Sequence, residues 1–195
     1  EQVHLAFSNT IKDETELRER TSAVCDRFLC RLPQIQAIAS WIDTHCADGE
    51  IAYMIPHDTL YCPDHFKNCQ LPATPINNKL AFGFSVPGTH YFPMQFFEAK
   101  YVLTADPFPL THVNDPENEM SHKLNEMFLA VRDEYFALEE TFDMGNGTTF
   151  TIWRRTVAPS RAEVEYYLSA FTEEDAKYPE MFSLVAENWL AARGL

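Results

Sequence analysis

The sequence predicts an α/β fold of the Rossmann-like class, with a three-layer arrangement in which helices cover both faces of a mainly parallel sheet that ends in an antiparallel hairpin. Short apolar runs closed by proline, such as residues 101–105 before Asp106-Pro107, are typical of buried strands. Stretches with apolar residues at helical spacing separate these runs. Two further runs flank the turn sequence Gly145-Asn146-Gly147, which predicts a hairpin.

Size, composition and charge limit both the organisation and the partners of the chain. Its 195 residues, 46% hydrophobic and 13% aromatic, are enough for one sizeable core, so we expect a single domain over residues 1–195. The net charge of −14 leaves no basic face to neutralise phosphates. A nucleic acid is therefore not an expected partner.

The first 48 residues are predicted to be helical. Apolar residues recur at helical spacing from Asp13 to Leu32, and Pro33 is expected to separate this helix from a second one. The second helix should end at Gly49, which suits a helix C-terminus. In an alternative interpretation, residues 1–48 form a stalk that leads from a membrane span.

Three strands are predicted in the middle of the chain, at residues 51–55, 80–86 and 101–105. We expect the last of them to be an interior strand, because its residues are uniformly apolar or small. A proline-rich, irregular region occupies residues 56–78. Residues 92–99 should form a short helix that brings phenylalanines onto the sheet.

The last third of the chain should begin with a helix over residues 115–131 and continue as the two hairpin strands, residues 135–142 and 148–154. Arg154-Arg155 is interpreted as an exposed pair at the sheet edge. Ser160 and Glu163 form a capping-box pattern that opens another helix, and a final helix is predicted over residues 180–194.

The irregular region contains side chains of the type that bind zinc: His57, Asp58, Cys62, Asp64, His65 and Cys69. Their spacing matches no standard zinc finger or ribbon, so we interpret them as a polar loop and assign no metal. A metal-dependent enzyme that uses His57, Asp58, His65 and Cys62 remains a third hypothesis for the function. Free thiols are preferred over a disulfide between Cys62 and Cys69.

Polar residues follow each of the three predicted strands: Asp58, Ser85 and Asp106. Ligands of open α/β sheets bind beyond the carboxyl ends of the strands, so this set could bind a small polar molecule. The competing interpretation is that these residues only cap loops. No cofactor is expected, since no glycine-rich phosphate loop follows a strand, and no catalytic residue is assigned.

Four segments, taken in order, resemble a known family: Gly88–Pro93, Ala99–Pro107, Thr151–Arg155 and Tyr178-Pro179. Together they are similar to the soluble tail of bacterial multi-pass membrane glycosyltransferases, of the class that resembles dolichyl-phosphate-mannose-dependent mannosyltransferases. The first segment departs from the family pattern. Its charged residues are replaced here, by Thr89-His90, so the role of that segment is not carried over.

The resemblance implies a non-catalytic accessory domain, tethered at the extracytoplasmic face of the cell membrane. In that family the catalytic carboxylates lie in loops of the membrane part, so none is placed on this chain. The implied partners are the membrane-embedded part of the parent protein and a saccharide or lipid-linked sugar acceptor. A start at Glu1 suits a tail excised from a longer protein.

Overall fold

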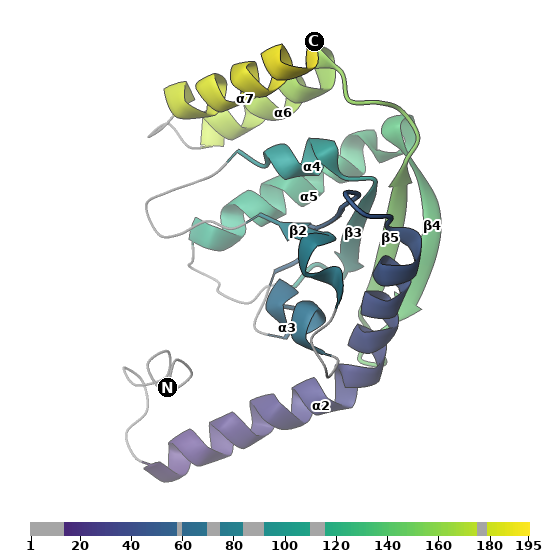
Figure 1. The fold of residues 1–195 in the computed structure, drawn as a ribbon. Helices are drawn as coiled ribbons and strands as arrows, with labels where there is room; N and C mark the ends of the chain where they lie inside the picture. The colour runs from purple at the N-terminus through teal and green to yellow at the C-terminus, as the bar shows by residue number, and fades with distance from the viewer. Residues whose placement is uncertain (1–13, 58–59, 70–74, 84–91, 110–115, 175–178) are drawn as a thin grey trace.

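A computed structural model gives the fold (Figure 1). The structure describes residues 14–57, 60–69, 75–83, 92–109, 116–174 and 179–195.

The described strands form one five-stranded mixed sheet in the order β2-β1-β3-β5-β4. The strands are β1 (Ala52–Met54), β2 (Leu80–Phe82), β3 (Tyr101–Asp106), β4 (Phe136–Asp143) and β5 (Thr149–Arg155). β1 pairs with β2 and β3 in parallel, whereas β5 pairs with β3 and β4 in antiparallel fashion. The α/β class is as predicted. The sheet is mixed because the hairpin adds as many antiparallel pairings as the first three strands make parallel ones.

The central position of β3 confirms the expectation of an interior strand. Every residue from Tyr101 to Ala105 is buried. Val102 points into the core on one face of the sheet and Leu103 into the core on the other, as the alternation of side chains along a strand requires.

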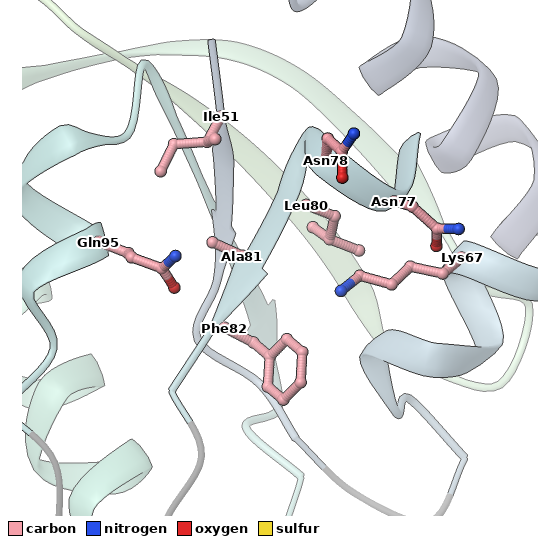
Figure 2. A pocket seen from close by; sticks show the side chains of 8 residues that line it. All are labelled: Ile51, Lys67, Asn77, Asn78, Leu80, Ala81, Phe82 and Gln95. Carbon is pink, nitrogen blue, oxygen red and sulfur yellow. The ribbon is translucent and has the colours of Figure 1, made fainter. Parts of the chain in front are cut away.

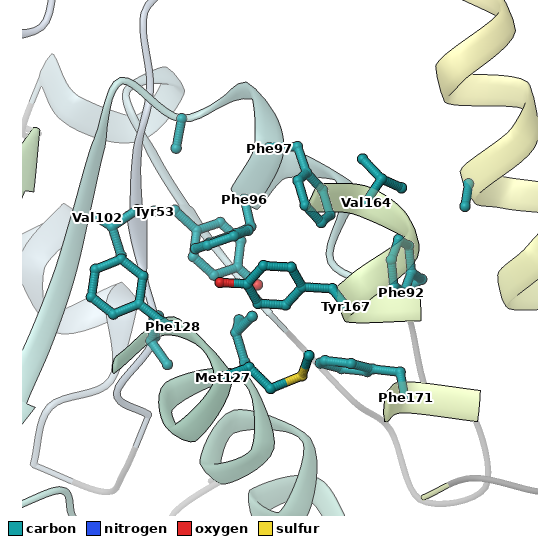
Figure 3. Close-up of a cluster of buried hydrophobic side chains, with 14 of the residues drawn as sticks. Tyr53, Phe92, Phe96, Phe97, Val102, Met127, Phe128, Val164, Tyr167 and Phe171 are labelled. Atoms are coloured by element: carbon teal, nitrogen blue, oxygen red, sulfur yellow. The ribbon is translucent and has the colours of Figure 1, made fainter. Parts of the chain in front are cut away.

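One face of the sheet packs against α4 (Met94–Glu98), α5 (Pro116–Tyr135), α6 (Arg161–Glu174) and α7 (Pro179–Arg193). The core on this side is strongly aromatic, and Figure 3 shows its rings packed side by side. Phe96 is at its centre, with ring centroids 5.2 Å from Phe97, 5.1 Å from Tyr167 and 5.7 Å from Tyr53. We call this cluster the aromatic core.

The other face packs against α2 (Glu14–His45), α3 (Pro63–Asn68) and the short 3-10 helix η1 (Pro75–Asn78). α2 is a single helix through Pro33, so the predicted break at that residue is wrong. Proline removes one backbone donor and bends a helix without necessarily ending it, and Figure 1 shows α2 changing direction along its length. The residues after the proline that anchor α2 are fully buried: Ile35, Ile38, Ala39 and Ile42.

α3 lies in the region that was predicted to be irregular. It starts at Pro63, a residue suited to a first helical position, and buries Phe66. Cys62 and Cys69 flank this helix, and no disulfide joins them. A helix of this length holds its two flanking residues roughly 10 Å apart, beyond the reach of a disulfide.

The predicted hairpin is present as β4 and β5. Gly145 and Gly147 in its turn have φ angles of +70° and +83°, which favour glycine. α5 extends to Tyr135 and passes directly into β4, so the helix is longer than predicted.

Within the described residues, no helix combines the length and the apolar character that crossing a bilayer would need.

Candidate functional site

The parallel strands β2, β1 and β3 end at the same edge of the sheet. The chain continues from β1 to β2 on one side and later returns to β3 on the other side of β1. This reversal makes the carboxyl ends of β1 and β3 the topological switch point, where open α/β sheets bind ligands.

One of the three sequence-predicted ligand residues can be placed at this edge. Asp106 ends β3, is exposed and pairs with Thr149 of β5. Asp58 and Ser85 lie outside the described residues. Asp106 therefore lies at this edge of the sheet, and the ligand-binding role of all three residues stays a prediction.

A hollow of about 440 Å³, here called the edge hollow, lies along β2, the outermost strand of the sheet (Figure 2). Lys67 extends from α3, with its ammonium nitrogen 5.0 Å from the centre of the Phe82 ring. Amide side chains border the hollow from η1 on one side and from α4 on the other. Its lining consists of Ile51, Lys67, Asn77, Asn78, Leu80, Ala81, Phe82 and Gln95.

A second hollow, here called the Tyr53 cavity, has a volume of about 480 Å³ and reaches from the surface into the aromatic core. Its floor includes Tyr53, whose side chain is 1% exposed. The full lining is Tyr53, Phe82, Gly83, Phe92, Pro93, Met94, Gln95 and Val185.

The hydroxyl of Tyr53 is buried and has no hydrogen-bond partner among the residues that the structure describes. Burial raises the pKa of this phenol well above its ordinary value, so the hydroxyl keeps its proton and is available as a donor. A buried polar group without a partner usually costs free energy.

No group of three or more His, Cys, Asp or Glu side chains that could hold a metal occurs in the part of the chain that the structure describes. In the predicted zinc-type cluster, the ring nitrogen Nδ1 of His65 lies 2.9 Å from the carbonyl oxygen of Leu60. Cys62 serves as the residue before α3, and Asp58 lies outside the described residues. His65 therefore lies in α3 and contacts the backbone of the segment that precedes the helix.

The surroundings of Cys46 suppress the reactivity of its thiol. Burial, and to a smaller degree the charge of Glu50, raise the pKa of the Cys46 thiol to about 11. A thiol protonated at neutral pH is a poor nucleophile.

Arg155 forms a buried ion pair with Glu163. The prediction that Arg155 is exposed is therefore wrong. Nη1 of Arg155 donates to both carboxylate oxygens of Glu163 at 3.0 Å, and the side chains are 8% and 0% exposed. The alternation of side chains along β5 could have indicated that Arg155 is buried. It places Arg155 on the same face as Trp153, toward the aromatic core. Arg154 on the opposite face forms an exposed pair with Glu139, as predicted for that residue.

Comparisons with known proteins give no match: no family model, no curated protein and no solved structure is similar to this chain.

Proposed function

We propose that the chain is an extracytoplasmic accessory domain of a membrane glycosyltransferase-like protein and does not itself transfer sugar. Two of the four segments that resemble this family pair with each other in the sheet, which supports the proposal. Residues 99–107 contain β3 and residues 151–155 lie in β5, and these strands pair over six positions, from Tyr101 with Arg154 to Asp106 with Thr149. Segments 50 residues apart in the sequence thus form the centre of one sheet.

The buried positions of these segments support an architectural role for them. Tyr101, Val102 and Leu103 are buried, and the indole nitrogen of Trp153 donates to the Thr104 hydroxyl at 3.0 Å. Side chains that hold two strands together are not available for chemistry. In this proposal the domain positions a saccharide or lipid-linked sugar acceptor for the membrane-embedded part of the parent protein.

The proposal is tested on the parent gene and on its product. The reading frame upstream of Glu1 should encode a series of hydrophobic spans, and the full-length protein should sediment with membranes. Protease added outside intact cells or spheroplasts should release a fragment that contains β3 to β5. A reading frame without hydrophobic spans before Glu1 would contradict the proposal.

A second candidate is a domain that binds a small polar ligand at the carboxyl ends of the strands, on a three-layer sheet of the Rossmann-like class. The strand order β2-β1-β3 favours it, because the reversal lies beside Asp106. A saturating ligand, at about a hundred times its Kd, should add about 2.7 kcal/mol to the free energy of unfolding of the wild type. Thermal denaturation with sugars and nucleotides tests this, and Asp106→Ala should abolish the increase. An unchanged melting temperature with every compound would count against this candidate.

A further inference from the structure

The edge hollow differs in charge from the rest of the chain. The protein has 29 acidic residues against 15 basic ones, yet the eight residues that line the hollow include one lysine, Lys67, and no acid. Figure 2 shows the Lys67 ammonium group between the side chains of Leu80 and Phe82. No acidic side chain of the lining offsets this charge, so an anion in the hollow would gain an ion pair.

Three amide side chains border the same hollow. Asn77 and Asn78 lie in η1, and Gln95 lies in α4. All three side chains are exposed, so a molecule in solution can reach them. An amide group both donates and accepts hydrogen bonds, as a hydroxyl group does. The amides therefore suit a ligand that carries several hydroxyl groups.

The edge strand adds backbone groups to the lining. The backbone N–H of Ala52 donates to the carbonyl oxygen of Lys79 at 2.7 Å, and Ala52 pairs with Leu80. In this parallel ladder the residues on either side of Leu80 face β1, so the N–H and C=O of Leu80 point toward the outer edge of the sheet. Leu80 lines the hollow, and its backbone donor and acceptor lie on the side that a ligand would occupy.

From this arrangement we infer that the edge hollow is a binding site for a sugar acid, a small molecule with one carboxylate for the Lys67 ammonium and hydroxyl groups for the amides. The volume of about 440 Å³ is in the range of small-molecule sites. Asp106 is not part of the lining, so this site is separate from the ligand edge considered above. The inference does not rest on the accessory role proposed for the domain.

The charge of the lining limits the ligand to a small anion. A single ammonium group matches a single carboxylate, whereas a polyanion would meet the net charge of −14 with one cation to compensate it. At physiological ionic strength, charges more than about 8 Å away are largely screened. Acidic residues far from the hollow therefore weaken the attraction of one carboxylate little.

The test compares three probes: D-glucuronate, D-glucose and acetate. Glucuronate carries a carboxylate where glucose carries a hydroxymethyl group, and acetate carries a carboxylate without hydroxyl groups. Each is titrated at low ionic strength into the isotope-labelled protein, while the side-chain amide NMR signals of Asn77, Asn78 and Gln95 are followed. Glucuronate should shift these signals and bind about 5-fold more tightly than glucose, the factor that an ion pair contributes at a partly exposed site. Acetate should bind more weakly than glucuronate, because it offers the amides no hydroxyl group.

Lys67→Met removes the charge and keeps a long side chain. It should abolish the preference for glucuronate over glucose and leave glucose binding unchanged. Lys123→Met, in α5 and outside the lining, is the matched control and should keep the preference of the wild type. The double variant Asn77→Ala/Asn78→Ala should weaken the binding of both sugars and leave acetate binding unchanged.

If Lys67→Met does not fold, salt decides, since about 0.5 M NaCl should remove the preference in the wild type by screening the ion pair. A preference that persists in high salt or in Lys67→Met would overturn the inference. Equal binding of acetate and glucuronate would overturn it too, as would absence of shifts at about 50 mM glucuronate, which nearly saturates a site with a Kd of about 5 mM. None of these results bears on the hydrophobic spans expected upstream of Glu1.

Discussion

Both side chains of the ion pair between Arg155 and Glu163 are buried. The pair joins the end of β5 to the first turn of α6, where the backbone N–H of Glu163 donates to the Ser160 hydroxyl at 3.2 Å in the capping box. The Arg155 guanidinium lies 4.5 Å from the centre of the Phe136 ring, which shields the pair from water. Because both charges are desolvated, each depends on the other.

Glu163→Ala should lower the free energy of unfolding by about 3–5 kcal/mol, since it leaves the buried Arg155 guanidinium without the two oxygens that accept its hydrogen bonds. The double variant Arg155→Met/Glu163→Leu should recover most of this loss, because it removes both charges and keeps the volume. Urea denaturation of the two variants measures the difference. Glu139→Ala is the control, as it breaks an exposed pair and should change the free energy far less. A double variant as unstable as Glu163→Ala would contradict the argument.

Acidification should stabilise the folded wild type relative to the folded Glu163→Gln variant. Burial raises the pKa of Glu163 above its ordinary value, with Arg155 acting in the opposite direction. A carboxyl whose pKa is higher in the folded state holds its proton more tightly there, so its contribution to stability grows as pH falls through the folded pKa toward the unfolded one. The other carboxylates are common to both proteins, so their contributions cancel in the difference between the two free energies of unfolding.

The difference in free energy of unfolding, wild type minus Glu163→Gln, should therefore rise between pH 7 and about pH 4, near the unfolded pKa of glutamate. Urea denaturation over this range measures it. A difference that falls on acidification would mean that the pairing with Arg155 outweighs burial.

At the level of elements, the hairpin is held by its turn and by the pairing of β5 with β3. The hydroxyl of Tyr61 accepts a hydrogen bond from the Asn146 side chain at 2.9 Å, which ties the turn to the segment before α3. Backbone amides of the turn are satisfied by Asp143 and Asn146 side chains. Hydrogen bonds within the turn and to Tyr61 therefore hold the turn in place at the start of β5.

Gly147→Ala should cost about 1–2 kcal/mol of stability, the penalty of a left-handed conformation for a residue with a Cβ. Nothing lies within 4 Å of a Cβ at this position, so the whole cost should come from the backbone. Gly147→Asn should cost less, since asparagine tolerates this conformation better. Urea denaturation of both variants gives the values, and an equal cost for the two residues would show that the backbone conformation is not the cause.

For the whole molecule, the decisive feature is that one sheet separates two apolar cores. The aromatic core lies under α4 to α7, and the second core lies under α2 and α3. Figure 1 shows the first half of α2 extending away from the sheet and from the other labelled elements. The second core therefore depends on the part of α2 that follows Pro33.

Deletion of residues 1–29 should leave the melting temperature within about 4 °C of the wild type, equivalent to about 1 kcal/mol for a chain of this size. Deletion of residues 1–45 should prevent folding, because it removes the buried isoleucines Ile35, Ile38 and Ile42, each worth about 2–5 kcal/mol. Circular dichroism on heating distinguishes the two. Loss of the folded state in the shorter deletion would mean that residues before Cys30 support the core.

Local patterns located most of the elements but not the ways in which they pair. Prolines and short apolar runs located all three parallel strands, and the paired glycines located the hairpin turn. The α3 helix escaped because its six residues contain a single apolar anchor, Phe66, which gives no periodicity. The strand order identifies the edge of the sheet where a ligand could bind. Of the three residues predicted to lie at this edge, the structure describes only Asp106.

The sequence by itself determined the α/β class, the interior position of β3 and the hairpin, because burial and turn geometry leave periodic or compositional traces in adjacent residues. Only the tertiary structure decided that β5 docks beside β3, that Arg155 meets Glu163, and that Gly83 lies against the Tyr53 hydroxyl. These contacts join residues on different elements, and their energies depend on distance and desolvation, which no local pattern records.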